Sequence, residues 1–179
     1  MSKISVLMSV YKKENPEYLR ASLESILVQT RTADEILLIE DGPLTQELYQ
    51  VVAEYQKKCD YLHVHAMEQN VQLGRALAKG VELCKYDLIA RMDTDDIAMP
   101  DRLEKEEAYM EAHPEVDVVG GAIREFNDEG TIDRVKNMPK TQEEILEYVK
   151  VRNPLNHMTV MYRNCLLYTS PSPRDPKTS

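Results

Sequence analysis

The sequence predicts an α/β fold, in which helices cover both faces of a mostly parallel β-sheet. Short apolar runs rich in β-branched residues alternate along residues 4–93 with segments whose apolar residues recur at helical spacing. The alternation repeats at the spacing of βαβ units, which places successive strands parallel in one sheet. Polar residues cluster after three of the expected strands, and in open sheets of this kind ligands bind beyond the carboxyl ends of the strands.

The first half of the chain is expected to hold four strands and three helices. The strands are predicted at residues 4–11, 35–41, 61–67 and 86–93. The first helix begins after Asn15, which suits an N-cap, and Pro16 suits the first helical position. Apolar residues at helical spacing define the buried faces of the three helices: Leu19, Leu23, Ile26 and Leu27; Leu44, Leu48, Val51, Val52 and Tyr55; Leu73, Leu77, Val81 and Cys84.

The second half is expected to add two helices, a hairpin and a last strand. A helix is predicted at about residues 100–112. It is followed by a strand with a glycine pair at 115–127, a turn at Asp128-Glu129-Gly130 and a second hairpin strand at 131–136. A helix over 142–151 and a strand at 157–163 complete the chain order. His113 and Pro114 end the first of these helices. Thr141 and Glu144 form a capping box for the second.

Composition limits the class of protein. A chain of 179 residues with 42% hydrophobic residues is long and apolar enough for one domain with a core. The net charge of −9 argues against a general nucleic-acid binder, which needs a basic surface. No apolar run reaches the roughly 18–20 residues that span a membrane. Three widely separated cysteines match no metal-binding pattern, and we expect reduced thiols in a cytoplasmic protein.

The end of the chain differs from the rest. Residues 165–179, CLLYTSPSPRDPKTS, contain three of the nine prolines and have no amphipathic period. This stretch resembles the translated sequencing adapter or vector read-through found at the ends of assembled sequence fragments. We therefore expect a non-native disordered tail at 165–179, preceded by a domain over 1–164 that is incomplete at its C-terminus.

The most unusual local sequence is a cluster of acids after the fourth expected strand. Asp93, Asp95 and Asp96 lie within four positions, and Asp101 follows them. Two carboxylates about 4 Å apart repel by roughly 4 kcal/mol at an effective dielectric constant of 20, so water, a proton, a basic partner or a cation must offset the repulsion. Carboxylate oxygens suit Mg²⁺ or Mn²⁺. Two hypotheses follow, a metal site or a solvated acidic turn.

Three weaker features accompany the acids. Asp41, after the second strand, could accept hydrogen bonds from a nucleotide base or ribose, or could simply form a turn with the glycine and proline that follow it. Asn70, Gly74 and Arg75 lie at the start of the third helix, where an anion is favoured, although a capped helix with a surface arginine explains them as well. A lone histidine such as His157, at the start of the last expected strand, is more often structural than catalytic, and His63 and His65 on the third strand are interpreted as structural.

Taken together, these motifs resemble those of glycosyltransferase family 2, whose members have the GT-A fold. Within the family the chain looks closest to bacterial transferases of capsule, exopolysaccharide and lipopolysaccharide assembly. The resemblance is carried, in the family's order, by SVLMSVY, EILLIEDGP, NVQLGRALAKG, ARMDTDDIAMPDRL, VVGGAIREF and NPLNHMTVMYR. It covers nearly all of residues 1–163 and implies a Rossmann-like GT-A sheet that is truncated at its C-terminus.

The resemblance also implies an activity. Members of the family transfer a sugar from a nucleotide-sugar donor, often a UDP-sugar, to a hydroxyl group of a saccharide or lipid-linked acceptor, with inversion at the sugar. A divalent ion, Mn²⁺ or Mg²⁺, would stabilise the negative charge on the departing nucleoside diphosphate. The chain is then expected in the cytoplasm, either free or at the inner face of the plasma membrane.

Nucleotide-binding residues follow from the resemblance, motif by motif. Val10 and Tyr11 would flank the base. Asp41 would contact the base, which the resemblance suggests is uracil. Arg75 would lie near the diphosphate, and Asp93 would help to hold the ribose or the metal.

Metal and acceptor residues follow in the same way. Asp95 would be the main metal ligand, with Asp93 as a further ligand and Asp96 supporting the site. Gly120 and Gly121 would allow the acceptor to approach closely.

One expected residue is missing. An inverting transferase needs a general base, which in this family is typically an acid of a Glu-Asp pair after the segment that matches NHMTVMYR, and no such pair follows Arg163. We therefore expect a donor-binding fragment with little or no activity. Two alternatives remain open. A sugar-1-phosphate nucleotidyltransferase would normally have a glycine-rich basic loop after the first strand, where this chain has SVYKKENPEY, and a non-catalytic nucleotide-sugar-binding domain would need no base.

Overall fold

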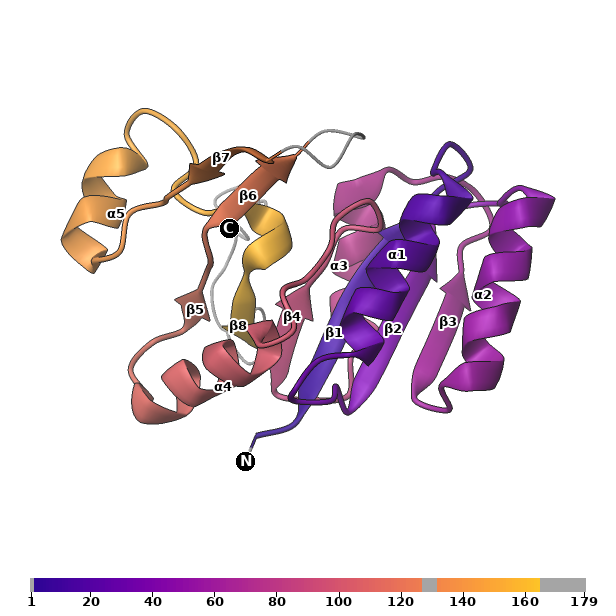
Figure 1. The fold of residues 1–179 in the computed structure, drawn as a ribbon, viewed down its shortest axis with the longest axis horizontal. Helices are drawn as coiled ribbons and strands as arrows, with labels where there is room; N and C mark the ends of the chain where they lie inside the picture. Colours follow the sequence, from indigo (N-terminus) through magenta and orange to yellow (C-terminus); the bar gives the residue numbers. More distant parts are fainter. Residues whose placement is uncertain (1, 127–131, 165–179) are drawn as a thin grey trace, which may run out of the picture.

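The computed structural model describes residues 2–126 and 132–164 as an α/β fold (Figure 1). The strands are β1 (Ile4–Val10), β2 (Glu35–Glu40), β3 (Leu62–Ala66), β4 (Leu88–Arg91), β5 (Val118–Val119), β6 (Ile123–Phe126), β7 (Ile132–Lys136) and β8 (Met161–Arg163). The helices are α1 (Pro16–Leu27), α2 (Gln46–Lys58), α3 (Leu73–Leu83), α4 (Arg102–Ala112), α5 (Gln142–Tyr148) and the 3-10 helix η1 (His157–Thr159).

The main sheet has six strands in the order β3-β2-β1-β4-β8-β5. Its first four strands are parallel, as the βαβ spacing predicted, and β8 lies antiparallel between β4 and β5. The carboxyl ends of β1 and β2 are level, because Val10 pairs with Glu40. The predicted α/β fold with a mostly parallel sheet is therefore confirmed, and the residues that follow these strands lie at one edge.

Helices cover both faces of the sheet, as expected. One core joins alternate residues of β1, such as Val6 and Met8, to α1, α2 and α4. The opposite core joins Leu7 of β1 and two residues of β2 to α3. Figure 1 shows α1 in front of the sheet and α3 behind it. Among the described residues, no helix combines the length and the apolar character that crossing a bilayer requires.

Three residues of the stripe predicted on α3, Leu77, Val81 and Cys84, pack in the core, and only Leu73 departs from the prediction. Leu73 is 44% exposed, and the helix contacts the sheet most closely through Ala76 and Gly80, which are buried. A Cβ atom at Gly80 would lie 2.4 Å from Cδ1 of Leu7. The helix approaches the sheet at its smallest residues, which frees Leu73 to line the cavity described below.

The prediction of one continuous strand at 115–127 is wrong. The chain forms β5 and then β6, which belong to different sheets, and the break falls at Gly120 and Gly121. The Gly121 amide donates a hydrogen bond to Oγ1 of Thr159 at 3.0 Å, so it leaves the sheet to bind the segment before β8. A Cβ at Gly120 would lie 3.1 Å from Cδ2 of Leu155, which explains why glycine suits position 120.

The predicted last strand is also shorter than expected. Residues 157–159 form η1, and only Met161–Arg163 pair in the sheet as β8. The hydroxyl group of Thr159 donates to the carbonyl of Asn156 at 2.8 Å, a local bond that competes with strand pairing. The turn therefore places His157 at the end of the sheet instead of within it.

The predicted helix caps are present. The Asn15 side chain accepts a hydrogen bond from the Glu17 amide, and Thr141 and Glu144 form both bonds of a capping box. The predicted hairpin is confirmed as the antiparallel pair β6 and β7. Its turn at 128–130 and the expected tail at 165–179 lie outside the described residues, as does Cys165. Cys59 and Cys84 are buried free thiols.

Candidate functional site

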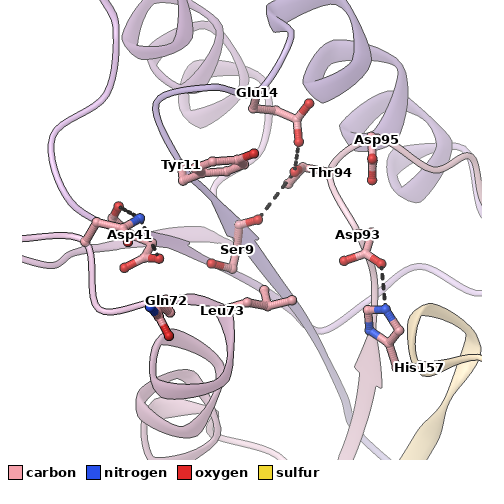
Figure 2. A pocket seen from close by; sticks show the side chains of 11 residues that line it. Ser9, Tyr11, Glu14, Asp41, Gln72, Leu73, Asp93, Thr94, Asp95 and His157 are labelled. Carbon is pink, nitrogen blue, oxygen red and sulfur yellow. Dashed lines mark hydrogen bonds and ion pairs between the residues drawn. The ribbon is translucent and has the colours of Figure 1, made fainter. Parts of the chain in front are cut away.

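A cavity of about 480 Å³ lies beyond the carboxyl ends of β1, β2 and β4 (Figure 2). It is lined by residues from these strand ends, from the start of α3 and from η1: Ser9, Tyr11, Glu14, Asp41, Asn70, Gln72, Leu73, Asp93, Thr94, Asp95 and His157. This is the edge at which parallel α/β sheets bind ligands.

One end of the cavity holds the acidic cluster. A carboxylate oxygen from each of Asp93, Asp95 and Asp96 lies within 4.8 Å of the others. Burial, followed by the negative charges of Asp93 and Asp95, raises the pKa of Asp96. Three converging carboxylates, one of them desolvated, form a donor set that suits a hard divalent cation such as Mg²⁺ or Mn²⁺.

Asp93 lies between two basic side chains. Nη2 of Arg91 donates a hydrogen bond to Oδ1 of Asp93, and Nε2 of His157 lies 3.5 Å from Oδ2. Figure 2 shows the His157 ring pointing at this carboxylate. Arg91 is only 4% exposed, and its Nε and Nη1 atoms are buried with no hydrogen-bond partner in the described part of the chain. A buried cation therefore lies directly beneath the acidic cluster and partly offsets its charge.

The turn that carries the acids is tied to neighbouring elements. The hydroxyl group of Thr94 donates to Oε2 of Glu14 at 2.7 Å, and its oxygen lies 3.3 Å from the carbonyl of Ser9. The Ser22 hydroxyl of α1 donates to the Asp93 carbonyl at 2.8 Å. These bonds fix the turn against β1 and α1, so the carboxylates are held in place by the surrounding fold.

The other end of the cavity is formed around Asp41. Its Oδ1 accepts a hydrogen bond from the Val71 amide at 2.7 Å, and its Oδ2 accepts one from the Asn70 side chain at 2.9 Å. Gly42 has a φ of 82°, and a Cβ there would lie 2.5 Å from the Asn70 nitrogen. Asp41 thus holds the loop before α3 against the end of β2. Tyr11, 44% exposed, faces the same end.

Most of the predicted site residues lie together. Tyr11, Asp41, Asp93 and Asp95 line the cavity, and Asp96 completes the acidic cluster. Two lie elsewhere. Val10 is fully buried in the core beneath the cavity, and Arg75 is exposed on α3 and is not part of the cavity lining. Gly120 and Gly121 pack against the segment before β8.

Sequence reasoning missed several residues of the site. His157, a lone histidine of the kind that is more often structural, lines the cavity and faces Asp93. Arg91 had a signal that was not used, because it is a charged residue in an otherwise apolar strand. Glu14 and Gln72 carried no signal, because only the folded loops bring them to the cavity.

Comparison with known proteins identifies the family. The sequence model of the family described as "Glycosyl transferase family 2" matches residues 5–170. An uncharacterised glycosyltransferase of Haemophilus influenzae is 48% identical over 90% of this chain and 60% of its own length. The amylovoran biosynthesis glycosyltransferase AmsE of Erwinia amylovora is 44% identical over 89% of the chain and 59% of its own length.

A third relative has a more specific name. The UDP-Gal:alpha-D-GlcNAc-diphosphoundecaprenol beta-1,3-galactosyltransferase of Escherichia coli is 35% identical over 91% of the chain and 59% of its own length. The chain therefore spans about 60% of the length of the curated relatives it matches.

Solved structures agree on the fold. S. aureus TarS 1–349 in complex with UDP-GlcNAc matches with a TM-score of 0.72 at 21% identity, over 93% of this chain and 46% of that one. The mannosyltransferase PcManGT of Pyrobaculum calidifontis, in complex with GDP-Man and Mn²⁺, matches with a TM-score of 0.68 at 13% identity, over 93% and 46% of the two chains. The expected GT-A fold is confirmed by these matches, and since the family model covers most of the sequence, the chain belongs to glycosyl transferase family 2.

Proposed function

We propose that this chain forms the donor site of a metal-dependent, inverting glycosyltransferase that uses a UDP-sugar. The acceptor would be a saccharide or a lipid-linked saccharide in the synthesis of a cell-surface polysaccharide. One observation carries the proposal. A single cavity has an acidic cluster at one end and an aromatic ring with polar loop residues at the other, the two ends that a metal-bound diphosphate and a base require.

The dimensions of the cavity suit a nucleotide. Its volume of about 480 Å³ falls within the roughly 300–1,000 Å³ typical of small-molecule sites. Tyr11 offers an exposed ring face for a base, and Asp41 lies beside it. The relative named as a UDP-galactose-dependent enzyme and the TarS complex with UDP-GlcNAc support uridine as the nucleoside.

Asp95 and Asp93 would hold the metal, with Asp96 behind them. The ion, when bound, would supply positive charge where the leaving diphosphate develops negative charge. Arg91 would keep the Asp93 carboxylate in one orientation through its hydrogen bond to Oδ1. The raised pKa of Asp96 supports the assignment, because a bound cation would stabilise the charged form of this buried carboxylate.

The general base is proposed to lie outside residues 1–164. The curated relatives that match this chain are longer than it, which supports a base in a part that they have and residues 1–164 do not include. Family membership argues against the sugar-1-phosphate nucleotidyltransferase alternative. A donor-binding role without transfer would be distinguished by assaying product formation with a full-length relative.

Calorimetric titration of UDP into the full chain tests the donor site. We expect binding that requires Mn²⁺, because the acidic cluster would otherwise repel the diphosphate. Asp95→Ala should weaken this binding by about tenfold or more, by analogy with the loss of a partner around a metal. Asp60→Ala is the matched control, because Asp60 is an exposed acid in the turn before β3, and it should bind UDP as the wild type does.

Two results would contradict the proposal. One is a folded wild-type chain that binds no UDP in the presence of Mn²⁺. The other is equal UDP affinity in Asp95→Ala and Asp60→Ala, which would remove the acidic cluster from the binding site.

A further inference from the structure

Gln72 has a backbone conformation that L-amino acids rarely adopt. Its φ is 72° and its ψ is 152°, and it is the only described residue other than glycine with a positive φ. Only glycine visits this region without strain. Gln72 directly precedes α3 and lines the cavity, where Figure 2 shows it next to Leu73 and below Asp41. A strained residue in a cavity wall is a candidate for a functional role.

Hydrogen bonds on both sides of Gln72 fix its strained backbone conformation. On the N-terminal side, Asp41 binds the Val71 amide and the Asn70 side chain, so the preceding residues cannot shift. On the C-terminal side, the carbonyl of Gln72 accepts hydrogen bonds from the Arg75 and Ala76 amides, both at 3.1 Å, and so begins the helix. The loop is thus fixed between β2 and α3, and this fixation determines where the Gln72 side chain lies.

The Gln72 side chain forms no interaction within the described fold that would compensate for the strain of its backbone. Gln72 is exposed, and its carboxamide makes no hydrogen bond to any other described residue. Glycine would adopt the same backbone without strain. The position is therefore hard to explain by folding alone, and because Gln72 lines the cavity, its carboxamide is available for contact with a ligand.

The location indicates which part of a ligand it meets. Gln72 lies at the Asp41 end of the cavity, away from Asp93 and Asp95. Asp41 itself is only 4% exposed, and each of its carboxylate oxygens already accepts a hydrogen bond from the loop. Gln72 therefore offers exposed hydrogen-bonding groups at this end beside those of Tyr11 and Asn70, and its amide can donate and accept at once.

We propose that Gln72 is a specificity-determining residue, whose carboxamide hydrogen-bonds the edge of the pyrimidine base of the donor nucleotide. The inference rests on the proposed function, because it assumes that the cavity binds a nucleotide. A uracil edge carries an N–H group between two carbonyl oxygens, and one carboxamide complements a donor–acceptor pair of this edge. The fixed backbone of this loop keeps Gln72 at the end of the cavity where the base would lie.

Two substitutions separate the strain from the contact. Gln72→Ala removes the carboxamide and keeps the strain, whereas Gln72→Gly removes both. Both variants should bind UDP with Mn²⁺ about threefold to tenfold more weakly than the wild type, the usual loss for one hydrogen bond between neutral groups. Gln72→Gly should have a melting temperature about 2–4 °C above that of Gln72→Ala, because only glycine relieves the strain. Gln69→Ala, an exposed glutamine of the same loop outside the cavity lining, is the control and should bind normally.

Inorganic pyrophosphate with Mn²⁺ serves as a second probe, because it lacks a base. A contact with the base predicts that Gln72→Ala binds pyrophosphate as the wild type does. An equal loss for pyrophosphate and UDP would overturn the inference, since it would place Gln72 at the diphosphate. If the wild type binds UDP and Gln72→Ala binds it equally well, the inference about Gln72 is overturned but the proposed function is not. Absence of UDP binding by the wild type would overturn the proposed function and this inference with it.

Discussion

Arg91 is the residue whose environment is hardest to account for by packing. Burying a guanidinium group costs free energy unless its hydrogen bonds are satisfied, and two of the three side-chain nitrogens of Arg91 have no partner among the described residues. Its one side-chain bond runs to Asp93, which also faces His157. A fixed positive charge under three acids leaves a net excess of two negative charges, which a divalent cation neutralises.

Because Arg91 is buried and paired with Asp93, we expect the variant that lacks both side chains to be more stable than the variant that lacks Asp93 alone. Asp93→Ala should lower the free energy of unfolding by about 2–3 kcal/mol, because it leaves a buried cation without an acceptor. Adding Arg91→Met to Asp93→Ala should restore most of that loss, because the unpaired charge is then removed. Urea denaturation of the wild type, the two single variants and the double variant measures the coupling free energy between Arg91 and Asp93.

Glu82→Ala provides the comparison for an exposed pair. Glu82 pairs with Lys79 on the surface of α3, and its loss should cost less than about 1 kcal/mol. If the double variant of Arg91 and Asp93 is as unstable as Asp93→Ala alone, the buried charge is not the cause of the loss.

At this scale the sequence predicted the acids but not their partners. Asp93, Asp95 and Asp96 are adjacent in the chain and follow a strand, so their convergence could be inferred from local pattern. His157 could not be assigned, because its contact with Asp93 depends on η1 and on the insertion of β8 beside β4. Such a contact arises from sheet order, which a pattern of apolar residues does not specify.

At the scale of elements, the close packing of α3 against the sheet positions one wall of the cavity. The helix lies close to β1 and β2 because Ala76 and Gly80 present almost no side chain to the sheet. This close approach brings the start of α3, with Gln72 and Leu73, to the cavity. A larger residue at the contact would push the helix outward.

Two glycines of α3 should respond in opposite directions to alanine. A Cβ at Gly80 would lie 2.4 Å from Cδ1 of Leu7 and 3.1 Å from Cγ1 of Ile39, so Gly80→Ala should destabilise by about 1–3 kcal/mol through overpacking. At Gly74 a Cβ would meet nothing within 4 Å, so Gly74→Ala should stabilise by up to about 1 kcal/mol through helix propensity. Thermal and urea unfolding compare the two, and equal effects would show that α3 does not approach the sheet so closely.

The elements that the sequence predicted well are those whose pattern is local. The four parallel strands and α1 to α3 follow from apolar periodicity and from caps such as Asn15. The region from 115 to 163 was predicted less well, because there the chain leaves one sheet, forms a hairpin and returns as β8. The bonds of Gly121 and Thr159 that direct this path join residues 38 positions apart.

At the scale of the whole molecule, charge constrains how a nucleotide could bind. The chain has a net charge of −9, and the cavity contains three acids besides the Glu14 carboxylate, so an anionic diphosphate is disfavoured on both counts. A divalent cation at the acidic cluster would replace this repulsion by attraction for the diphosphate at one end of the cavity. The location of the metal would therefore determine the orientation of the nucleotide in the cavity.

The most direct test is an anomalous X-ray diffraction measurement at the manganese absorption edge, on crystals of the chain grown with UDP and Mn²⁺. The account predicts an anomalous peak at the carboxylates of Asp95 and Asp93, bridged to the diphosphate, with the uracil ring beside Tyr11 and within reach of Gln72. A nucleotide bound outside this cavity, or bound with its base at the acidic end and no manganese peak at Asp95, would contradict it.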